Sequence, residues 1–225
     1  SGDPSPSTAY GVFVGLKEAV RQRLGRDELT GLKVAIQGVG HVGLGLARHL
    51  KAAGAELWVA DIFDANVKQA MDELGANVVR PQDIYGLDVD VFAPCAMGGI
   101  LNEQTLEVLR APVIAGAANN QLASHAIGDE LYRRGILYAP DYAVNAGGVM
   151  NVSLEIDGYN RERAMRLIRS IYYNVSKIFD LSEKEKISPQ YAADRIAEAR
   201  LAAIGKLKLP MGRTRPRMGH LRGEH

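Results

Sequence analysis

Short apolar segments alternate with amphipathic helical patterns along the first 140 residues of the chain. The apolar segments are rich in β-branched residues and end at glycine, proline or charged residues, which is typical of buried strands. We predict strands at residues 32–37, 55–61, 77–79, 89–96, 112–118 and 135–140. Strands that alternate with helices form parallel sheets, because each parallel pair needs a crossover connection. The pattern therefore predicts an α/β fold with a doubly wound, mostly parallel sheet.

Apolar residues between these segments recur at spacings of three and four, as on one face of a helix. Helices are predicted at residues 8–24, 41–54, 64–75, 102–110 and 122–134. Asp64 is expected to be the N-cap of the third helix, and Gly54 and Gly75 are expected to end the second and third.

The strand pattern stops after residue 145, and helices are predicted at residues 146–157, 160–186 and 188–207. Ser188 is the expected N-cap of the last helix and Pro189 its first residue. Residues 208–225 have no periodicity and predict a disordered tail, so the folded domain is expected to span residues 1–207.

The segment KVAIQGVGHVGLGLARHL holds a G-x-G-x-x-G pattern between a predicted strand and a predicted helix. In this context Gly38 allows a tight turn, Gly40 lets the backbone approach a pyrophosphate, and Gly43 lets the helix pack closely. Asp61 ends the next strand and can accept hydrogen bonds from an adenosine ribose. Its charge would repel a 2′-phosphate, so the pattern predicts a Rossmann-type site that prefers NAD to NADP. The alternative to a nucleotide site is a glycine-rich turn beside a solvated aspartate. Gly45 is expected only to allow close packing of the helix.

Small residues fill the loops that follow the last three predicted strands, at residues 93–99, 115–121 and 139–148. Ligands bind at the carboxyl ends of strands in open parallel sheets, so these loops are candidate binding elements. Asn119, Asn120 and Asn145 can each donate and accept hydrogen bonds there. Helix capping is the alternative role; we favour it for Asn120 and favour ligand binding for Asn119 and Asn145.

Composition narrows the class of protein. The 225 residues are 47% hydrophobic with a net charge of +1, which favours neither nucleic acid nor a membrane surface as a partner. No apolar run is long enough to span a membrane, and the first residues do not resemble a signal peptide. With the single cysteine, Cys95, this predicts a cytoplasmic location. The sequence does not begin with Met, so we expect a processed or excised piece.

Nucleophilic and metal chemistry are weakly indicated. Cys95 has no histidine beside it in its motif, so we expect an unreactive thiol. The 5 histidines show no metal-ligand spacing, and no metal is predicted.

Several segments together resemble the glutamate/leucine/phenylalanine/valine dehydrogenases, and leucine dehydrogenases most. They keep the family's order and cover most of residues 2–200. They are GDPSPSTAYGV, GVGHVG, PCAMGGILN, IAGAANNQL, GILYAPDYAVNAGGVMNV and GYNRERA. The resemblance implies that the chain is the NAD-binding half of such an enzyme, and that the family's preceding substrate and catalytic domain is absent from it.

The resemblance also implies roles for individual residues. The glycine-rich turn would hold the pyrophosphate and Asp61 the adenosine ribose, while backbone groups after the fourth strand would line the nicotinamide. The cofactor-binding residues implied are Gly38, Val39, Gly40, His41, Val42, Gly43, Asp61, Ile62, Cys95, Ala96, Met97, Ala117 and Asn119. Asn119 would meet the nicotinamide carboxamide or its ribose, and Asn145 the substrate carboxylate. Val149 and Val152 would wall the substrate side-chain pocket, unless they are ordinary helix core.

The family's reaction is the reversible oxidative deamination of an L-amino acid to a 2-oxo acid, with ammonia and NADH as products. A lysine of lowered pKa and a carboxylate move the protons, and the family carries them in its preceding domain. None of the lysines in this sequence lies in a glycine-rich loop, so we expect no catalytic residue here. The full-length protein is expected to be a homo-oligomer. A free-standing NAD-binding sensor or regulatory module is the alternative function.

Overall fold

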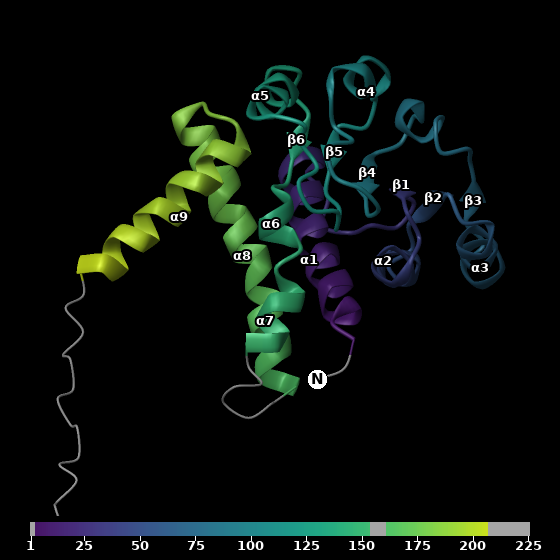
Figure 1. Cartoon of the computed structure of the whole chain (residues 1–225), viewed down its shortest axis with the longest axis horizontal. Helices are drawn as coiled ribbons and strands as arrows, with labels where there is room; N and C mark the ends of the chain where they lie inside the picture. Colours follow the sequence, from purple (N-terminus) through teal and green to yellow (C-terminus); the bar gives the residue numbers. More distant parts are fainter. Residues whose placement is uncertain (1–2, 154–160, 207–225) are drawn as a thin grey trace, which may run out of the picture.

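The computed structural model of the chain describes residues 3–153 and 161–206 (Figure 1). The tail predicted at residues 208–225 and the end of the helix predicted at 146–157 lie outside the described residues.

Six parallel strands form one sheet in the order β3-β2-β1-β4-β5-β6. They are β1 (Lys33–Gln37), β2 (Glu56–Ala60), β3 (Asn77–Val78), β4 (Val91–Pro94), β5 (Val113–Ile114) and β6 (Leu137–Tyr138). Gln37 pairs with Ala60 on one side and with Pro94 on the other, so β1, β2 and β4 end level at one edge of the sheet. The strand order changes direction between β1 and β4, which is where open parallel sheets bind ligands. The predicted α/β fold with a Rossmann-type sheet is confirmed.

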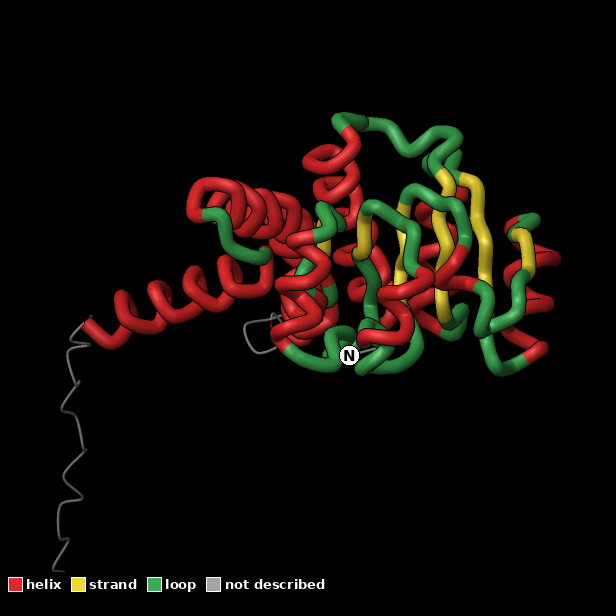
Figure 2. Tube along the Cα trace, turned by 90° about the horizontal axis from the view of Figure 1, so that it is seen from above, coloured by secondary structure: helices red, strands yellow, loops and turns green. Residues whose placement is uncertain are grey.

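Helices cover both faces of the sheet (Figures 1 and 2). One face carries α1 (Ser5–Leu24), α2 (His41–Ala52) and α3 (Asp64–Leu74). The other carries η1 (Ile84–Gly86), α4 (Glu103–Val108) and α5 (His125–Arg133). The chain continues through α6 (Asp141–Val144), α7 (Gly147–Ser153), α8 (Arg161–Glu185) and α9 (Pro189–Lys206). Helix α8 packs along α1, and the end of α9 points away from the sheet.

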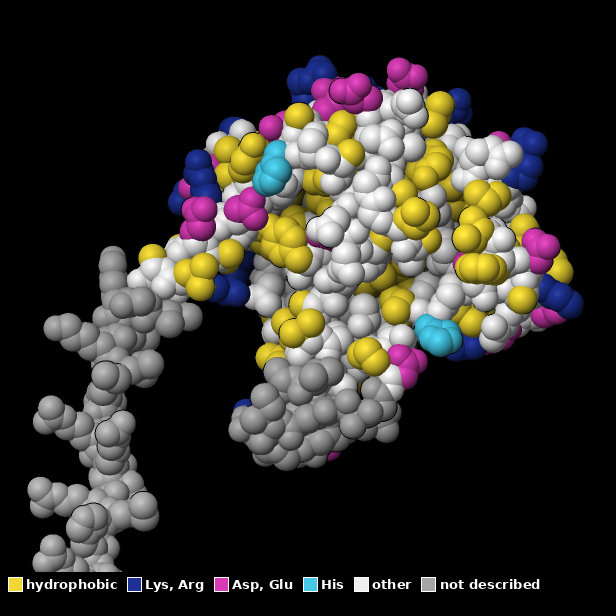
Figure 3. All heavy atoms as spheres, in the orientation of Figure 1, with side chains coloured by type: hydrophobic (Ala, Val, Ile, Leu, Met, Phe, Trp, Pro, Cys, Tyr) yellow, Lys and Arg dark blue, Asp and Glu magenta, His cyan; other side chains and the backbone are white. Residues whose placement is uncertain are grey.

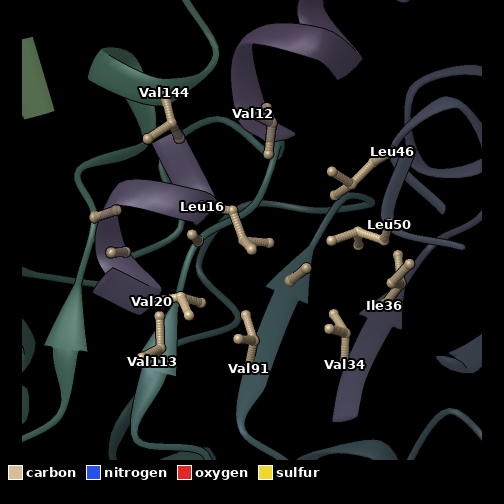
Figure 4. Packing of buried hydrophobic residues seen from close by; sticks show 14 of the residues in the cluster. Val12, Leu16, Val20, Val34, Ile36, Leu46, Leu50, Val91, Val113 and Val144 are labelled. Atoms are coloured by element: carbon tan, nitrogen blue, oxygen red, sulfur yellow. The ribbon is translucent and has the colours of Figure 1, made fainter. Parts of the chain in front are cut away.

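The two faces of the sheet are set by the period-two alternation of strand side chains. Val34 and Ile36 belong to the core beneath α1 and α2, whereas Ala35 between them belongs to the core beneath α4 and α5. Figure 4 shows Leu16 and Leu46 converging on the first of these cores. Burying each large aliphatic side chain there stabilises the fold by about 1.5–3 kcal/mol.

Helix boundaries differ from the predictions where a local signal has two meanings. Phe63 is the N-cap of α3, and Asp64 lies inside its first turn, where an acid still interacts favourably with the helix dipole. Ala53 is the C-cap of α2, and Gly54 follows it with φ 84°. Gly75 ends α3 in the left-handed conformation, as predicted.

Asn120 does not cap a helix, so that interpretation was wrong. If Asn120 were the N-cap, the next helix would begin at residue 121. Helix α5 begins four residues later, at His125, and Ser124 is its N-cap. Asn120 instead has φ 51°, a conformation that asparagine tolerates better than most residues, and its carbonyl accepts the Gly99 N–H at 2.7 Å. The residue shapes a turn.

Candidate functional site

The glycine-rich turn joins β1 to α2, and its glycines have different surroundings. Gly38 has φ 90°, and a Cβ placed there would lie 2.6 Å from the Cβ of Ala96. A Cβ on Gly43 would lie 1.9 Å from the carbonyl oxygen of Gly38. A Cβ on Gly40 would meet nothing within 4 Å. Packing therefore requires glycine at the first and third positions, whereas the second faces open space.

The open space at Gly40 lies at the N-terminus of α2, with Gly40 as the N-cap and His41 as the first, exposed helical residue. The first N–H groups of a helix have no partner within the helix and carry partial positive charge. No side chain caps this end. The turn can therefore receive an anion such as a pyrophosphate. Gly45 packs against Ala9 of α1, as expected.

Asp61 follows β2 and reaches back to the glycine-rich turn. Its Oδ2 accepts the Val39 N–H at 2.8 Å and the Asn66 side-chain N–H at 3.2 Å, while Oδ1 accepts the Phe63 N–H at 2.9 Å. A carboxylate offers about four acceptor positions, so room remains for a ribose hydroxyl. The sequence did not reveal that Asp61 also braces the turn. Ile62 beside it is 77% exposed and offers an apolar surface.

A hollow of about 580 Å³ lies between this turn and the loops that follow β5 and β6. It is lined by Pro4, Thr8, Val42, Ala117, Asn119, Asn145, Gly148 and Val149. The structure thus brings together five of the predicted site residues, Val42, Ala117, Asn119, Asn145 and Val149, from α2 and from the segments after β5 and β6. None of these lining residues is charged, so an uncharged or apolar group fits here best.

Asn119 and Asn145 meet inside this hollow. Asn145 Nδ2 donates to Asn119 Oδ1 at 2.6 Å and to the Ala117 carbonyl at 3.4 Å. A primary amide nitrogen has two hydrogens, and these contacts use both. Within the described residues, the pair leaves the Asn119 amide hydrogens and Asn145 Oδ1 for a ligand. A donor beside an acceptor matches a carboxamide, whereas a carboxylate would have to displace the Asn145 contacts.

The predicted residues after β4 lie next to the glycine-rich turn. The Cys95 N–H donates to the Gln37 carbonyl at 2.7 Å, which joins this loop to the end of β1. Burial raises the pKa of the Cys95 thiol to about 12, opposed by a backbone hydrogen bond with Ala117. This agrees with the interpretation of an unreactive thiol, because the thiolate is the nucleophile. Ala96 and Met97 are exposed beyond it.

The two predicted valines lie on α7. Val149 is 75% exposed and lines the hollow, so it is surface rather than helix core. Val152 is in the same helix, but its side chain lies outside the described residues.

Pro4 and Thr8 at the start of α1 were not predicted as site residues. They reach the hollow because small residues let α1 and α7 approach closely: a Cβ on Gly147 would lie 2.3 Å from the Ser7 carbonyl. Likewise, a Cβ on Gly116 would lie 2.1 Å from the Pro94 carbonyl. The small residues in these segments were the available signal, and it did not indicate which segments would meet.

Charged side chains are unevenly distributed over the face that Figure 3 draws. On the face drawn in Figure 3, charged side chains of both signs lie mostly around the edge, and the centre is largely apolar or uncharged. Among the described residues, no group of three or more His, Cys, Asp or Glu side chains could hold a metal ion. No described helix has the length and apolarity needed to cross a membrane.

Known proteins resemble this chain in sequence and in fold. The family model for "Glutamate/Leucine/Phenylalanine/Valine dehydrogenase" matches residues 59–208. Leucine dehydrogenase of Geobacillus stearothermophilus is 51% identical over 210 residues, which are 93% of this chain and 57% of the relative. L-tryptophan dehydrogenase of Nostoc punctiforme is 47% identical over 203 residues, 90% of this chain and 58% of the relative.

A solved structure agrees in three dimensions. The crystal structure of L-tryptophan dehydrogenase from Nostoc punctiforme superposes with a TM-score of 0.87 at 45% identity, over 90% of this chain and 62% of that one. The chain thus spans somewhat more than half the length of these relatives. The structure has a Rossmann-type sheet and a glycine-rich turn that is open at Gly40. The family model covers most of this sheet and the helices that follow the sheet. These findings agree, and the chain belongs to the glutamate/leucine/phenylalanine/valine dehydrogenase family.

Proposed function

We propose that the chain is the cofactor-binding half of an NAD-dependent L-amino-acid dehydrogenase. The substrate class is a branched-chain or aromatic L-amino acid, which is oxidised to its 2-oxo acid with release of ammonia. Support comes from the relatives, which are named leucine, tryptophan and phenylalanine dehydrogenases. The apolar, uncharged hollow beside Val149 suits such a side chain.

The observation that carries the NAD proposal is the geometry of the turn at the point where the strand order changes direction. Gly40 leaves open space before the N-terminus of α2, while Asp61 is fixed beside it by the Val39 N–H. A pyrophosphate on the helix terminus would bring the adenosine ribose toward the carboxylate. The same carboxylate would repel a 2′-phosphate, which favours NAD over NADP.

Each remaining residue has a role that its position allows. Bound NAD would supply the acceptor for the hydride that leaves the amino acid's α-carbon. Asn119 would donate to the carboxamide of the nicotinamide, and Ala117 and Val42 would contact the ring. Asn145 would orient Asn119 through the 2.6 Å hydrogen bond, and its other amide hydrogen would leave the Ala117 carbonyl, 3.4 Å away, to meet the substrate carboxylate. Val149 and Val152 would border the substrate side chain.

The groups that move protons would come from outside these 225 residues. The described residues lining the hollow include no lysine, histidine or acid, whereas the reaction must remove a proton from the amino group and activate water. We therefore propose that a separate domain supplies a lysine and a carboxylate. This chain would then bind the cofactor without turning over substrate by itself.

The test is an absorbance assay for NADH at alkaline pH, with leucine, valine or phenylalanine in excess. We expect no useful turnover by the chain alone, because losing general acid–base catalysis lowers rates by about 10²–10⁴. Activity should appear when the part of the Geobacillus leucine dehydrogenase that this chain does not match is added. Robust turnover by the pure chain would contradict the proposal that a separate domain supplies the lysine and the carboxylate. If the mixture also forms no NADH, an NAD-binding sensor without catalysis would be favoured.

A further inference from the structure

Two buried polar residues are hydrogen-bonded to the segments that carry Asn119 and Asn145, and neither lines the hollow. Gln121 is fully buried, and Asp141 is 7% exposed. Burying an amide or a carboxylate is costly unless hydrogen bonds replace water, so their contacts identify what they are for. Their side-chain hydrogen bonds go to the two segments that carry the asparagines.

Gln121 closes the loop on which Asn119 lies. Its side-chain amide donates to the Gly116 carbonyl at 3.0 Å and to the Ala118 carbonyl at 2.9 Å. Its own carbonyl accepts the Leu101 N–H at 3.0 Å, which ties the end of the loop to the segment after β4. Asn119 itself is exposed at the outside of this closed loop. One buried side chain therefore fixes the backbone on the inner side of the loop that presents Asn119.

Asp141 joins this loop to Asn145. Its Oδ2 accepts the Gln121 N–H at 3.1 Å, and its Oδ1 accepts the Tyr142 N–H at 2.7 Å. Its main-chain carbonyl accepts the Asn145 N–H at 2.8 Å, one helical turn further on. The same residue thus bonds to the position two residues after Asn119 and to Asn145 itself. This double attachment fixes the distance between the two asparagines, whose side chains meet at 2.6 Å.

We propose that Asp141 and Gln121 are positioning residues that set the Asn119–Asn145 pair for recognition of the nicotinamide end of the cofactor. The proposal rests on the proposed NAD-binding function and assigns a structural cause to the orientation of the pair. A carboxylate is required at position 141 because both of its oxygens face N–H donors. An amide would turn one donor toward another, and charge-assisted hydrogen bonds to the backbone would be lost.

The test compares two ligands that share everything except the nicotinamide. The dissociation constants of NAD and ADP-ribose are measured by calorimetry for the unsubstituted chain and for Asp141→Asn, together with thermal unfolding. We expect Asp141→Asn to weaken NAD binding at least about tenfold and to leave ADP-ribose binding within about twofold. Asp194→Asn is the matched control, because Asp194 accepts the Tyr142 side-chain hydroxyl at 2.9 Å in the same region, a bond that involves neither the Gln121 backbone nor the Asn145 backbone. It should leave both constants unchanged.

A second variant keeps the test decisive if Asp141→Asn does not fold. Gln121→Met introduces an apolar side chain of similar length and removes the donors to the Gly116 and Ala118 carbonyls, so it should show the same selective loss. Equal weakening of both ligands, or no weakening of either, would overturn the positioning role. So would equal affinity of the unsubstituted chain for NAD and ADP-ribose. If the unsubstituted chain binds neither ligand, the proposed function fails instead.

Discussion

The two ends of the proposed cofactor site lie along one edge of the sheet, yet they are built differently. At the β1–α2 turn, Gly38 and Gly43 are fixed by backbone contacts, and Gly40 leaves open space. At the loops after β5 and β6, the surface is made by side chains, with Asn145 donating to Asn119 at 2.6 Å.

The difference shows what each end can discriminate. Backbone N–H groups at a helix terminus recognise charge and bring no fine selectivity, because every phosphate presents the same oxygens. Oriented amides recognise a pattern of donors and acceptors. We therefore expect substitutions at the turn to affect the fold or the binding of all nucleotides. Substitutions at the asparagines should affect the selectivity for ligands that carry the nicotinamide.

The largest effect is expected for Gly43→Val. Its Cβ would lie 1.9 Å from the Gly38 carbonyl, which is backbone and cannot rotate away. Overpacking of this kind costs about 3 kcal/mol, so the melting temperature should fall by about 6–12 °C, and NAD binding should be lost. Differential scanning calorimetry measures the first effect. A melting temperature equal to that of the parent would mean that α2 does not pack as described.

Gly40→Val is the matched control, because it makes the same change at the second glycine of the pattern. A Cβ there meets nothing within 4 Å, so the fold should keep its melting temperature. The branched side chain would occupy the space proposed for the pyrophosphate, and NAD affinity should fall about 100-fold with the loss of charge-assisted hydrogen bonds. Normal NAD affinity in this variant would place the site elsewhere on the molecule.

Asp61→Ser combined with Ile62→Arg should reverse nucleotide preference. Removing the carboxylate removes a repulsion of about 1 kcal/mol or more toward a 2′-phosphate, and the arginine adds a partner for it. The ratio of NADP to NAD affinity should rise at least about tenfold. Absolute affinity should also decrease, because Asp61 no longer braces Val39. An unchanged ratio of NADP to NAD affinity would show that Asp61 does not contact the adenosine ribose.

Asn119→Ala should lower NAD affinity about tenfold through the loss of one hydrogen bond at the nicotinamide end. The side chain is exposed, so thermal stability should change little. Asn120→Gly is the neighbouring control, because glycine accepts the φ of 51° at that position. If both variants bind NAD like the parent, Asn119 is not part of the site.

The smallest effect on binding is expected for Cys95→Ala, at less than about twofold in NAD affinity. The raised pKa, about 12, keeps the thiol protonated at neutral pH. In the folded chain, alkylation at pH 8 should be about a thousandfold slower than for a free cysteine, and it should accelerate as the pH rises toward 12. Rapid alkylation at pH 8 would show that Cys95 is accessible and activated.

The strand–turn–helix geometry of the glycine-rich turn could be predicted from the sequence because each of its signals is local. A strand, three glycines at fixed spacing and an acid after the next strand have one common physical meaning, and the sheet order agrees with it. The strand lengths were overestimated at β5 and β6, which have 2 residues each. There the chain leaves the ladder to form the loops of the site.

The asparagine end was predicted only in part, because its geometry depends on contacts distant in the sequence. Asn120 looked like a cap and proved to shape a turn. Asp141 and Gln121 gave no signal, since a buried acid and a surface acid look alike before the fold is known. The single helix expected after Asn145 is preceded by α6, whose short turn places Asn145 against Asn119.

The central claim is that this edge of the sheet binds NAD through the turn at Gly40 and the carboxylate of Asp61. Calorimetric titration of the unsubstituted chain with NAD and with NADP tests it most directly. We predict one NAD site per chain and NADP binding at least about fivefold weaker, as expected for a like-charge repulsion of about 1 kcal/mol or more. Absence of NAD binding, or equal affinity for the two nucleotides, would contradict the account.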